Sequence, residues 1–240
     1  MIMKTAIITQ ARISSTRLPK KVLKKIQNKT LLEYHVERAQ QSGYPVIVAT
    51  STDPQDEPIV TLCKERDFYL FRGNLEDVLS RYYTCAMSYN LQTIVRITSD
   101  CPLIDGQLID RALKKFTSHH VDYLSNTVKR TFPRGFDFEI MTMQTLEKTC
   151  INAKKQSERE HVTPYIWRSH PDDFKIEHFI QSSDESGYRI TVDTLEDFAV
   201  VEILIERYHA DKMSYADIIK VLHQHPEISQ INSQVIQKYL

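Results

Sequence analysis

Glycine and acidic residues are scarce at the start of this 240-residue sequence. The chain has only five glycines, none before Gly43, and residues 1–32 contain no aspartate or glutamate. A Walker A phosphate loop needs glycine at both ends of its turn, so that motif is excluded. Eight lysines and arginines occur in the same 32 residues. This local excess of positive charge favours a site for an anion.

Long apolar runs and clustered cysteines are also missing. No apolar run approaches the length of a membrane span, and residues 1–8 are too short for a signal sequence. The four cysteines are widely spaced, which argues against a zinc knuckle or a disulfide framework. A formal net charge of +0 argues against a general attraction to nucleic acid or to an anionic membrane. We therefore expect a soluble, cytoplasmic protein.

Short apolar runs alternate with amphipathic stretches in the first half of the chain, which is typical of parallel strands joined by helices. Strands are expected at residues 5–9, 46–50, 69–71 and 94–97. Helices are expected to begin at Thr30, after Pro54 and after Asn74, and a fourth to cover 105–116. The pattern predicts an α/β, Rossmann-like fold with a mixed, mostly parallel central sheet flanked by helices.

The second half is richer in strands, which are expected at residues 136–141, 174–180 and 189–192. Helical stretches surround Leu146 and His161, another helix opens at Thr194, and the tail over 215–240 is helical and polar. Without a repeat or linker, residues 1–240 form one domain. Its expected parts are a nucleotide-binding core (1–125), a small strand-rich substrate or dimerisation lobe (126–188), and a final part (189–240) with the strand before Asp193 and the C-terminal helices.

Two loops are expected to face each other at one edge of the sheet. Ligands of such folds bind at the carboxyl ends of the strands, where the strand order reverses, and right-handed crossovers make the first and fourth strands neighbours there. Residues 10–21 would then face residues 98–103. The first loop offers Arg12, Arg17, two lysines and the hydroxyls of residues 14–16, which suit a polyphosphate. A solvated basic surface loop is the alternative.

Asp100 and Asp193 each follow an apolar strand. Because Mg²⁺ takes one or two carboxylates together with phosphate oxygens, the pair predicts a metal and triphosphate site opposite the basic loop. Capping of a turn or helix is the alternative for Asp100.

Many segments resemble a known family of enzymes. They are residues 10–12, 15–19, 48–51, 71–73, 77–79, 81–83, 96–105, 125–126, 159–165, 192–194, 196–197 and 225–227, together with Lys21. On these segments the chain resembles the spore coat polysaccharide biosynthesis cytidylyltransferase-like family, and more distantly the acylneuraminate and 3-deoxy-manno-octulosonate cytidylyltransferases. The resemblance covers nearly the whole chain.

The resemblance implies a nucleotidyltransferase fold, a homodimer, and transfer of CMP from CTP to a sugar acid of the nonulosonic type, with Mg²⁺ as cofactor and pyrophosphate as product. Such a reaction would serve surface polysaccharide or glycan biosynthesis. Three alternatives stay open: nucleotidyl transfer to a sugar phosphate, glycosyl transfer from a nucleotide sugar, and non-catalytic nucleotide binding. The Asp-x-Asp motif of many glycosyltransferases is absent from the sequence.

The resemblance also assigns residues. The implied catalytic residues are Arg12, Lys21, Asp100 and Asp193, and the two aspartates are the implied Mg²⁺ ligands. The implied nucleotide-binding residues are Gln10, Ala11, Arg12, Ser15, Arg17, Lys21, Ala49, Thr50, Ser51, Arg72, Arg81 and Asp100. Candidates for contact with the acceptor are Arg134, Asp137, Glu139, Glu160 and His161.

Three of these positions need comment. His161 has an alternative role as an ordinary helix residue packed beside its neighbours. Ser14 and Lys20 stand where the family loop usually has glycine. A left-handed backbone at either position would cost energy, and altered activity is expected.

Overall fold

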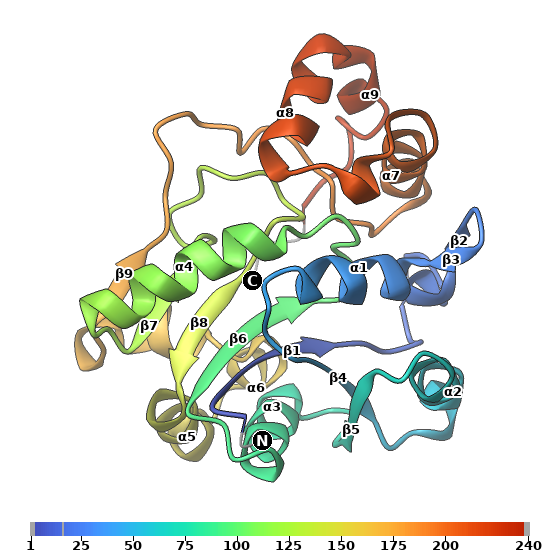
Figure 1. Cartoon of the computed structure of the whole chain (residues 1–240). Coiled ribbons are helices and arrows are strands. Elements are labelled where there is room, and N and C mark those ends of the chain that lie inside the picture. Colours follow the sequence, from blue (N-terminus) through green and yellow to red (C-terminus); the bar gives the residue numbers. More distant parts are fainter. Residues whose placement is uncertain (1–2, 16, 238–240) are drawn as a thin grey trace.

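The computed structural model describes residues 3–15 and 17–237. A seven-stranded sheet in the order β5-β4-β1-β6-β8-β7-β9 forms its centre (Figure 1). The strands are β1 Thr5–Gln10, β4 Val46–Ser51, β5 Tyr69–Gly73, β6 Thr93–Thr98, β7 Tyr123–Ser125, β8 Glu139–Thr142 and β9 Ile176–His178. A separate two-stranded hairpin joins β2 Lys25–Ile26 to β3 Lys29–Thr30.

Neighbouring strands of the seven-stranded sheet pair in parallel except where β8 is involved. β1 lies between β4 and β6, so the first and fourth strands expected from the sequence are neighbours. The predicted mixed, mostly parallel sheet is confirmed. β7, β8 and β9 extend this same sheet, and since β8 and β9 belong to the expected second lobe (126–188), strands of that lobe continue the central sheet.

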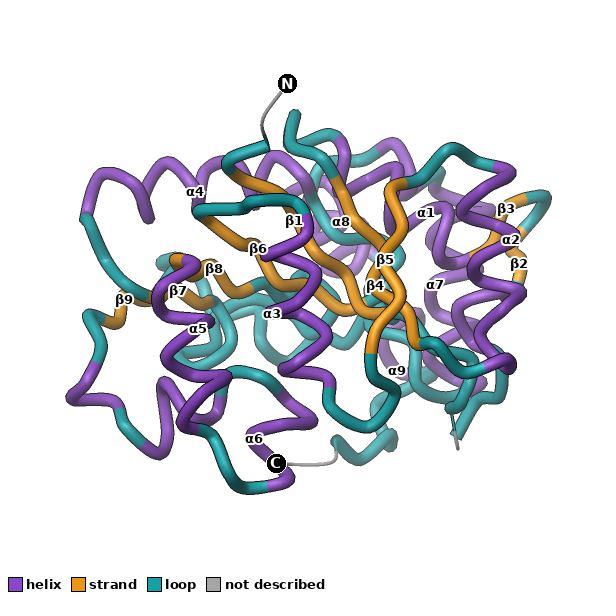
Figure 2. Tube along the Cα trace, turned by 90° about the horizontal axis from the view of Figure 1, so that it is seen from below, coloured by secondary structure: helices purple, strands orange, loops and turns teal. Residues whose placement is uncertain are grey.

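Helices cover both faces of the sheet. Figure 1 shows α1 and α4 on one face, with α7, α8 and α9 beyond them, and Figure 2 shows α3, α5 and α6 on the other face. The helices are α1 Leu31–Gln40, α2 Glu57–Glu65, α3 Val78–Ser88, α4 Gly106–His119, α5 Met143–Asn152, α6 Gln156–His161, α7 Leu195–Tyr208, α8 Tyr215–Gln224 and α9 Pro226–Gln230. None of the helices in the described part of the chain has the length and apolar composition that a bilayer crossing needs.

The central strands are apolar on both sides because both of their faces are covered. Ile7 and Val48 belong to the core on the α1 side, whereas the alternate residues Ile8 and Ile47 belong to the core on the α3 side. Cys63, Cys85 and Cys101 are buried in these cores as free thiols, and Cys150 is partly exposed on α5.

The predicted start of α1 is confirmed by its capping box. The Glu33 amide donates to the Thr30 hydroxyl at 3.2 Å, and the Glu33 carboxylate accepts from the Thr30 amide at 2.7 Å. α3 begins later than predicted, at Val78, because the Asn74 side chain accepts from the amide of Asp77 at 3.0 Å and closes a turn. Asp77 is the residue that caps α3.

The strand predicted at residues 189–192 is wrong. This segment makes a single bridge, between Arg189 and Arg134, and lies between two loops. The Ile190 amide donates to the Arg134 carbonyl at 2.7 Å, and the Val192 amide donates to the Asp100 carbonyl at 2.8 Å. Its backbone groups are therefore satisfied away from any sheet edge.

Other predicted boundaries also shift. The strand expected at 136–141 begins only at Glu139, and the one expected at 174–180 is limited to β9. The predicted helical tail ends with α9, and residues 231–237 are not helical.

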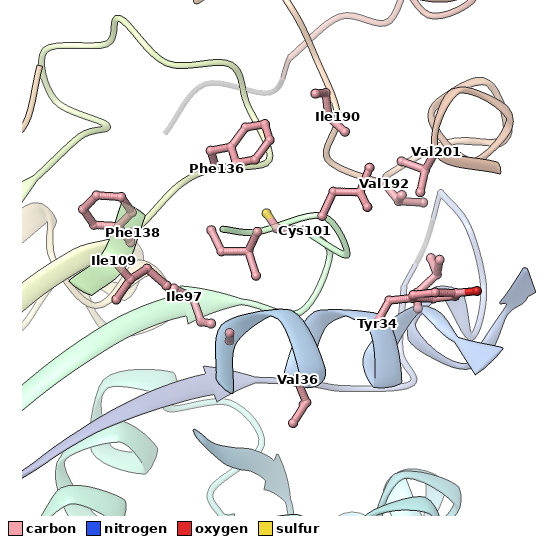
Figure 3. Close-up of a cluster of buried hydrophobic side chains, with 14 of the residues drawn as sticks. Tyr34, Val36, Ile97, Cys101, Ile109, Phe136, Phe138, Ile190, Val192 and Val201 are labelled. Atoms are coloured by element: carbon pink, nitrogen blue, oxygen red, sulfur yellow. The ribbon is translucent and has the colours of Figure 1, made fainter. Parts of the chain in front are cut away.

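A cluster of buried apolar side chains joins these loops to the core (Figure 3). Phe136 and Phe138 precede β8, Ile97 belongs to β6, and Val192 lies opposite them near Val201 of α7. Because Val192 is anchored in this cluster, the next residue, Asp193, has a fixed position at the carboxyl end of the sheet.

Candidate functional site

A cleft of about 890 Å³ opens where β1 and β6 end. Its lining comes from the loops after these two strands, from residues 127–139 and 160–168, and from Thr191 and Asp193. The cationic side chains that line it are Arg12, Arg17, Lys21, Arg81, Arg96, Arg130, Arg134 and Arg168, and the carboxylates are Asp100, Asp137, Glu139, Glu160 and Asp193. The excess of cations suits an anionic ligand.

The loop after β1 is tied to the neighbouring strand. The Ala11 amide donates to the Ala49 carbonyl at 3.3 Å, and the Ile13 amide donates to the Asp56 carboxylate at 2.7 Å. The other oxygen of Asp56 accepts from the Ser51 hydroxyl at 2.5 Å. Ser51 therefore orients Asp56, and Asp56 in turn fixes the loop.

The two loops meet at an ammonium group. Lys21 Nζ lies 3.0 Å from Asp100 Oδ2 and 2.8 Å from Asp193 Oδ1. The other oxygen of Asp193 is 3.0 Å from an Arg17 nitrogen and 2.9 Å from an Arg189 nitrogen. The predicted juxtaposition of the loops after β1 and β6 is thus present, with Asp193 beside them.

Backbone contacts hold the two aspartates. The Val192 amide donates to the Asp100 carbonyl at 2.8 Å, and the Asp193 amide donates to the Asp197 carboxylate at 3.0 Å. Arg189 also pairs with Asp197, at 2.8 Å. Each aspartate is consequently held by its main chain, and its carboxylate is directed to the cleft.

The local charges shift two pKa values. Burial disfavours the charged form of Lys21, but Asp100 and Asp193 outweigh it and raise the pKa of the ammonium. Burial likewise opposes ionisation of Asp100, but Lys21 holds the pKa of that carboxyl well below its usual range. Lys21 and Asp100 are both charged at neutral pH.

Asp137 and Glu139 line the cleft already paired with arginines. Arg130 Nη1 donates to Asp137 at 2.5 Å, and Arg96 pairs with Glu139, which also accepts from the buried Tyr123 hydroxyl. These carboxylates therefore add little net negative charge to the cleft.

His161 ends α6 beside a strained turn. Val162 has φ 73°, and the Thr163 amide donates to the His161 carbonyl at 2.9 Å, which closes a γ-turn that is rare and costly for a β-branched residue. The turn places Glu160, His161 and Thr163 on the cleft. Burial lowers the pKa of His161, against the opposing effect of Glu160, so the imidazole is neutral at physiological pH.

Most of the site residues expected from the sequence line this cleft. They are Gln10, Ala11, Arg12, Ser15, Arg17, Lys21, Arg81, Asp100, Arg134, Asp137, Glu139, Glu160, His161 and Asp193. Lining the cleft does not by itself test the role assigned to each residue.

Four expected nucleotide-binding residues are not brought into the cleft. Ala49, Thr50 and Ser51 are fully buried at the end of β4, and Arg72 pairs with Glu57 at 2.8 Å. Their contact with a nucleotide stays a prediction. Thr16, whose hydroxyl belongs to the same predicted loop, lies outside the described residues.

Ser14 and Lys20, which stand where the family loop usually has glycine, differ in backbone conformation. Lys20 has φ 55°, in the left-handed region, whereas Ser14 is not among the residues with positive φ. The expected backbone cost therefore applies to Lys20 alone.

Sequence reasoning missed several lining residues. A charge within the apolar strand β6 is a signal that could have identified Arg96, which lines the cleft. Arg130, Arg168 and Trp167 carried no such signal, because their position depends on contacts between distant segments.

Asp100 and Asp193 alone do not complete the coordination of Mg²⁺, so a bound ligand must supply further oxygens. Within the described residues, no three His, Cys, Asp or Glu side chains come together as a complete metal-binding set. Mg²⁺ commonly uses one or two carboxylates and completes its coordination with phosphate oxygens and water. Asp100 and Asp193 fit such a shared site.

Comparisons with known proteins agree with this geometry. The sequence pattern of the family described as Cytidylyltransferase matches residues 6–234. The chain is 37% identical to an uncharacterised protein of Methanocaldococcus jannaschii, over 98% of this chain and 97% of the relative. It is 30% identical to the spore coat polysaccharide biosynthesis protein SpsF of Bacillus subtilis, over 92% of this chain and 94% of the relative.

A match over part of the sequence and a match to a solved structure agree with these relatives. The chain is 38% identical to the 3-deoxy-manno-octulosonate cytidylyltransferase of Solibacter usitatus, over 51% of this chain and 48% of the relative. A cytidylyltransferase structure from Leptospira borgpetersenii superimposes with a TM-score of 0.91 at 35% identity, over 99% of this chain and 100% of the other. The chain therefore belongs to the cytidylyltransferase family and is a CTP-dependent nucleotidyltransferase.

Proposed function

We propose that the protein transfers CMP from CTP to a sugar acid of the nonulosonic type, with Mg²⁺ as cofactor, in the biosynthesis of a surface polysaccharide or glycan. The observation that carries the proposal is the meeting of Arg17 and Lys21 with Asp100 and Asp193 in one cleft. Flexible cations and paired carboxylates are the groups that a metal-bound triphosphate requires.

The size and lining of the cleft support a second, anionic ligand. A volume of about 890 Å³ is near the upper end of the roughly 300–1,000 Å³ of small-molecule pockets, which leaves room for an acceptor beside the nucleotide. Arg134 and Arg168 line the same cleft, and arginine binds carboxylates in a planar, bidentate way. One relative is named for its action on 3-deoxy-manno-octulosonate, which is a sugar acid.

The reaction needs positioning and charge neutralisation rather than a protein nucleophile. An acceptor oxygen forms a bond to the α-phosphorus, and the bond from this phosphorus to the bridging oxygen breaks as pyrophosphate leaves. Arg17 and Lys21 stabilise the negative charge on the phosphates. Neutral His161, which lines the cleft, takes up the proton of the attacking hydroxyl as the new bond forms. Mg²⁺ held by Asp100 and Asp193 would supply further positive charge to the phosphate oxygens.

Pyrophosphate release tests the reaction. Each of the four nucleoside triphosphates is combined with a panel of sugar acids and sugar phosphates, with and without Mg²⁺. We expect release only with CTP, a sugar acid and the metal. Release with sugar phosphates alone would replace the proposed acceptor, and no release with CTP across a broad panel would refute the proposal.

Asp100→Asn is the matched variant for this assay. It keeps the side-chain shape but removes the charge, so we expect turnover to fall below detection while the thermal unfolding transition is kept. A fully active variant would show that Asp100 does not hold the metal.

We further propose a homodimer in solution. Met87 on α3 and Ile151 on α5 are 53% and 61% exposed, and large apolar side chains on adjacent helices favour association. Analytical ultracentrifugation should give twice the mass of the chain; a monomer at micromolar concentration would contradict this.

A further inference from the structure

In this structure Lys21 occupies a position between the two carboxylates that the proposed function assigns to Mg²⁺. Its ammonium is 3.0 Å from Asp100 and 2.8 Å from Asp193. The second oxygen of Asp193 accepts from Arg17 and Arg189. The carboxylates are thus already neutralised by cations of the protein.

This cluster contains equal numbers of positive and negative side chains. Three cations, Arg17, Lys21 and Arg189, are interleaved with three carboxylates, Asp100, Asp193 and Asp197. The Lys21 and Asp193 side chains are only 14% and 12% exposed. Removal of one partner would leave a poorly solvated charge, which is costly.

Neither ligand can therefore bind well alone. A metal ion that arrives without nucleotide must displace the Lys21 ammonium and leave it without a counter-ion. A triphosphate that binds without metal must attract Arg17 and Lys21. This leaves Asp100 without its cation and leaves Asp193 close to it with Arg189 alone. When both ligands bind, the phosphates pair with Lys21, and the metal ion pairs with the carboxylates of Asp100 and Asp193.

The three cationic side chains differ in how easily they can leave the carboxylates for a phosphate. Arg189 is 8% exposed and is held by the fully buried Asp197, so it stays in place. Arg17 is 31% exposed, and Lys21 has a flexible four-carbon stem on the edge of the cleft.

We propose that Lys21 is a resident counter-ion that holds the metal position until CTP arrives, then moves to the phosphates as Mg²⁺ replaces it between Asp100 and Asp193. The inference rests on the proposed function. It makes the binding of metal and nucleotide mutually dependent, and by linkage each ligand strengthens the other by the same factor.

The test measures binding and needs no turnover. Mn²⁺ is titrated, with free ion followed by electron paramagnetic resonance, into the protein alone and with a non-hydrolysable α,β-methylene analogue of CTP. The fluorescence of Trp167, the single tryptophan, reports analogue binding from within the cleft. For the parent protein we expect the analogue to tighten Mn²⁺ binding by about 10-fold or more, within the usual range of coupling between ligands.

Lys21→Gln separates the inference from the proposed function. With the competing ammonium removed, Mn²⁺ alone should bind about fivefold more tightly than to the parent, while the gain from the analogue shrinks. Lys25→Gln is the control, because Lys25 is exposed and does not line the cleft. Thermal unfolding of each variant verifies that it is folded.

The outcomes are distinct. If Lys21→Gln leaves the affinity for Mn²⁺ alone unchanged while Asp100→Asn abolishes binding, the metal site stands and the counter-ion role of Lys21 is refuted. If the parent binds no Mn²⁺ even with the analogue, the metal part of the proposed function fails, and the inference fails with it.

Discussion

At the scale of single residues, the clearest local cost lies at Lys20. Its backbone is left-handed, with φ 55° and ψ 26°, a conformation that costs a side-chain-bearing residue roughly 1–2 kcal/mol. Lys20→Gly should raise the free energy of unfolding by up to about 1 kcal/mol, since the greater freedom of the unfolded chain offsets part of the relief. Urea unfolding measures this change.

Ser14→Gly is the matched control for Lys20→Gly. Without positive φ at Ser14, this change should lower the free energy of unfolding by about 0.5–1 kcal/mol. Equal effects of the two variants would contradict the assignment of strain to Lys20. Equal turnover of the parent and both variants would contradict the expectation that these residues alter activity.

His35 makes stability depend on pH. It is fully buried, and its Nδ1 donates to the Cys101 carbonyl at 2.8 Å while Nε2 accepts from the Thr9 hydroxyl at 2.9 Å. Burial lowers its pKa to about 4, against about 6.5 in the unfolded chain. Between about pH 4 and 6.5 the unfolded state therefore binds the proton of His35 more strongly than the folded state does.

The sign of the effect follows from linkage. The contribution of His35 to stability is complete above about pH 6.5 and is lost as the pH falls toward 4, by about 3 kcal/mol in total. Urea unfolding at several pH values gives the free energy of unfolding of the parent and of His35→Gln. The difference between these two free energies should shrink by this amount as the pH falls from about 6.5 to about 4. A constant difference between the two proteins would show that His35 is not the titrating group.

At the scale of elements, Gly135 joins the segment before β8 to residues 189–192. It has φ 112°, and a Cβ at this position would lie 2.7 Å from the Ile190 carbonyl carbon and 2.8 Å from the Thr191 nitrogen. Gly135→Ala must push these backbones apart, so we expect a loss of about 2–4 kcal/mol in the free energy of unfolding. Turnover should fall too, because the same segment positions Asp193.

Gly187→Ala is the control for Gly135→Ala, because a Cβ there meets no atom within 4 Å. Its free energy of unfolding should stay within about 0.5 kcal/mol of the parent value. A similar small effect of Gly135→Ala would contradict the close approach of the two segments.

Local patterns predicted some elements well and failed for others. Short apolar runs predicted the strands β1, β4, β5 and β6, and the common order of parallel sheets predicted that β1 and β6 are neighbours, so the facing of the loops after them followed from the sequence. The segment 189–192 has an equally apolar pattern, but its amides pair with carbonyls of Arg134 and Asp100. Pairing between such distant loops leaves no trace in local periodicity.

At the scale of the whole molecule, Arg38 ties α1 to the C-terminal helices. It is buried and donates to the carbonyls of Ile104 at 2.9 Å, Asp211 at 2.9 Å and Met213 at 3.0 Å. Arg38→Met keeps the bulk but leaves these carbonyls without their donor, so we expect the free energy of unfolding to fall by about 3 kcal/mol or more. Urea unfolding measures the loss.

Hydrogen exchange should locate the effect of Arg38→Met. Amides of α7 and α8 should exchange faster, because Asp211 and Met213 connect these two helices, whereas those of β1 and β4 should change less. Arg111→Met on the exposed side of α4 is the control. A uniform change over all elements would contradict a role for Arg38 in docking the C-terminal helices.

The burial of the cysteines has a practical consequence for spectroscopy. Burial raises the pKa of Cys63 and Cys85 to about 12, and that of Cys101 well above its ordinary value, so these thiols have almost no reactive thiolate at neutral pH. Burial raises the pKa of Cys150 as well, but Cys150 is the cysteine that is partly exposed and can be reached by a reagent. A maleimide dye would therefore attach at Cys150 without mutagenesis. Because Arg159 of α6 donates to the Cys150 carbonyl, this dye would follow α6, and with it the His161 side of the cleft, while substrates bind.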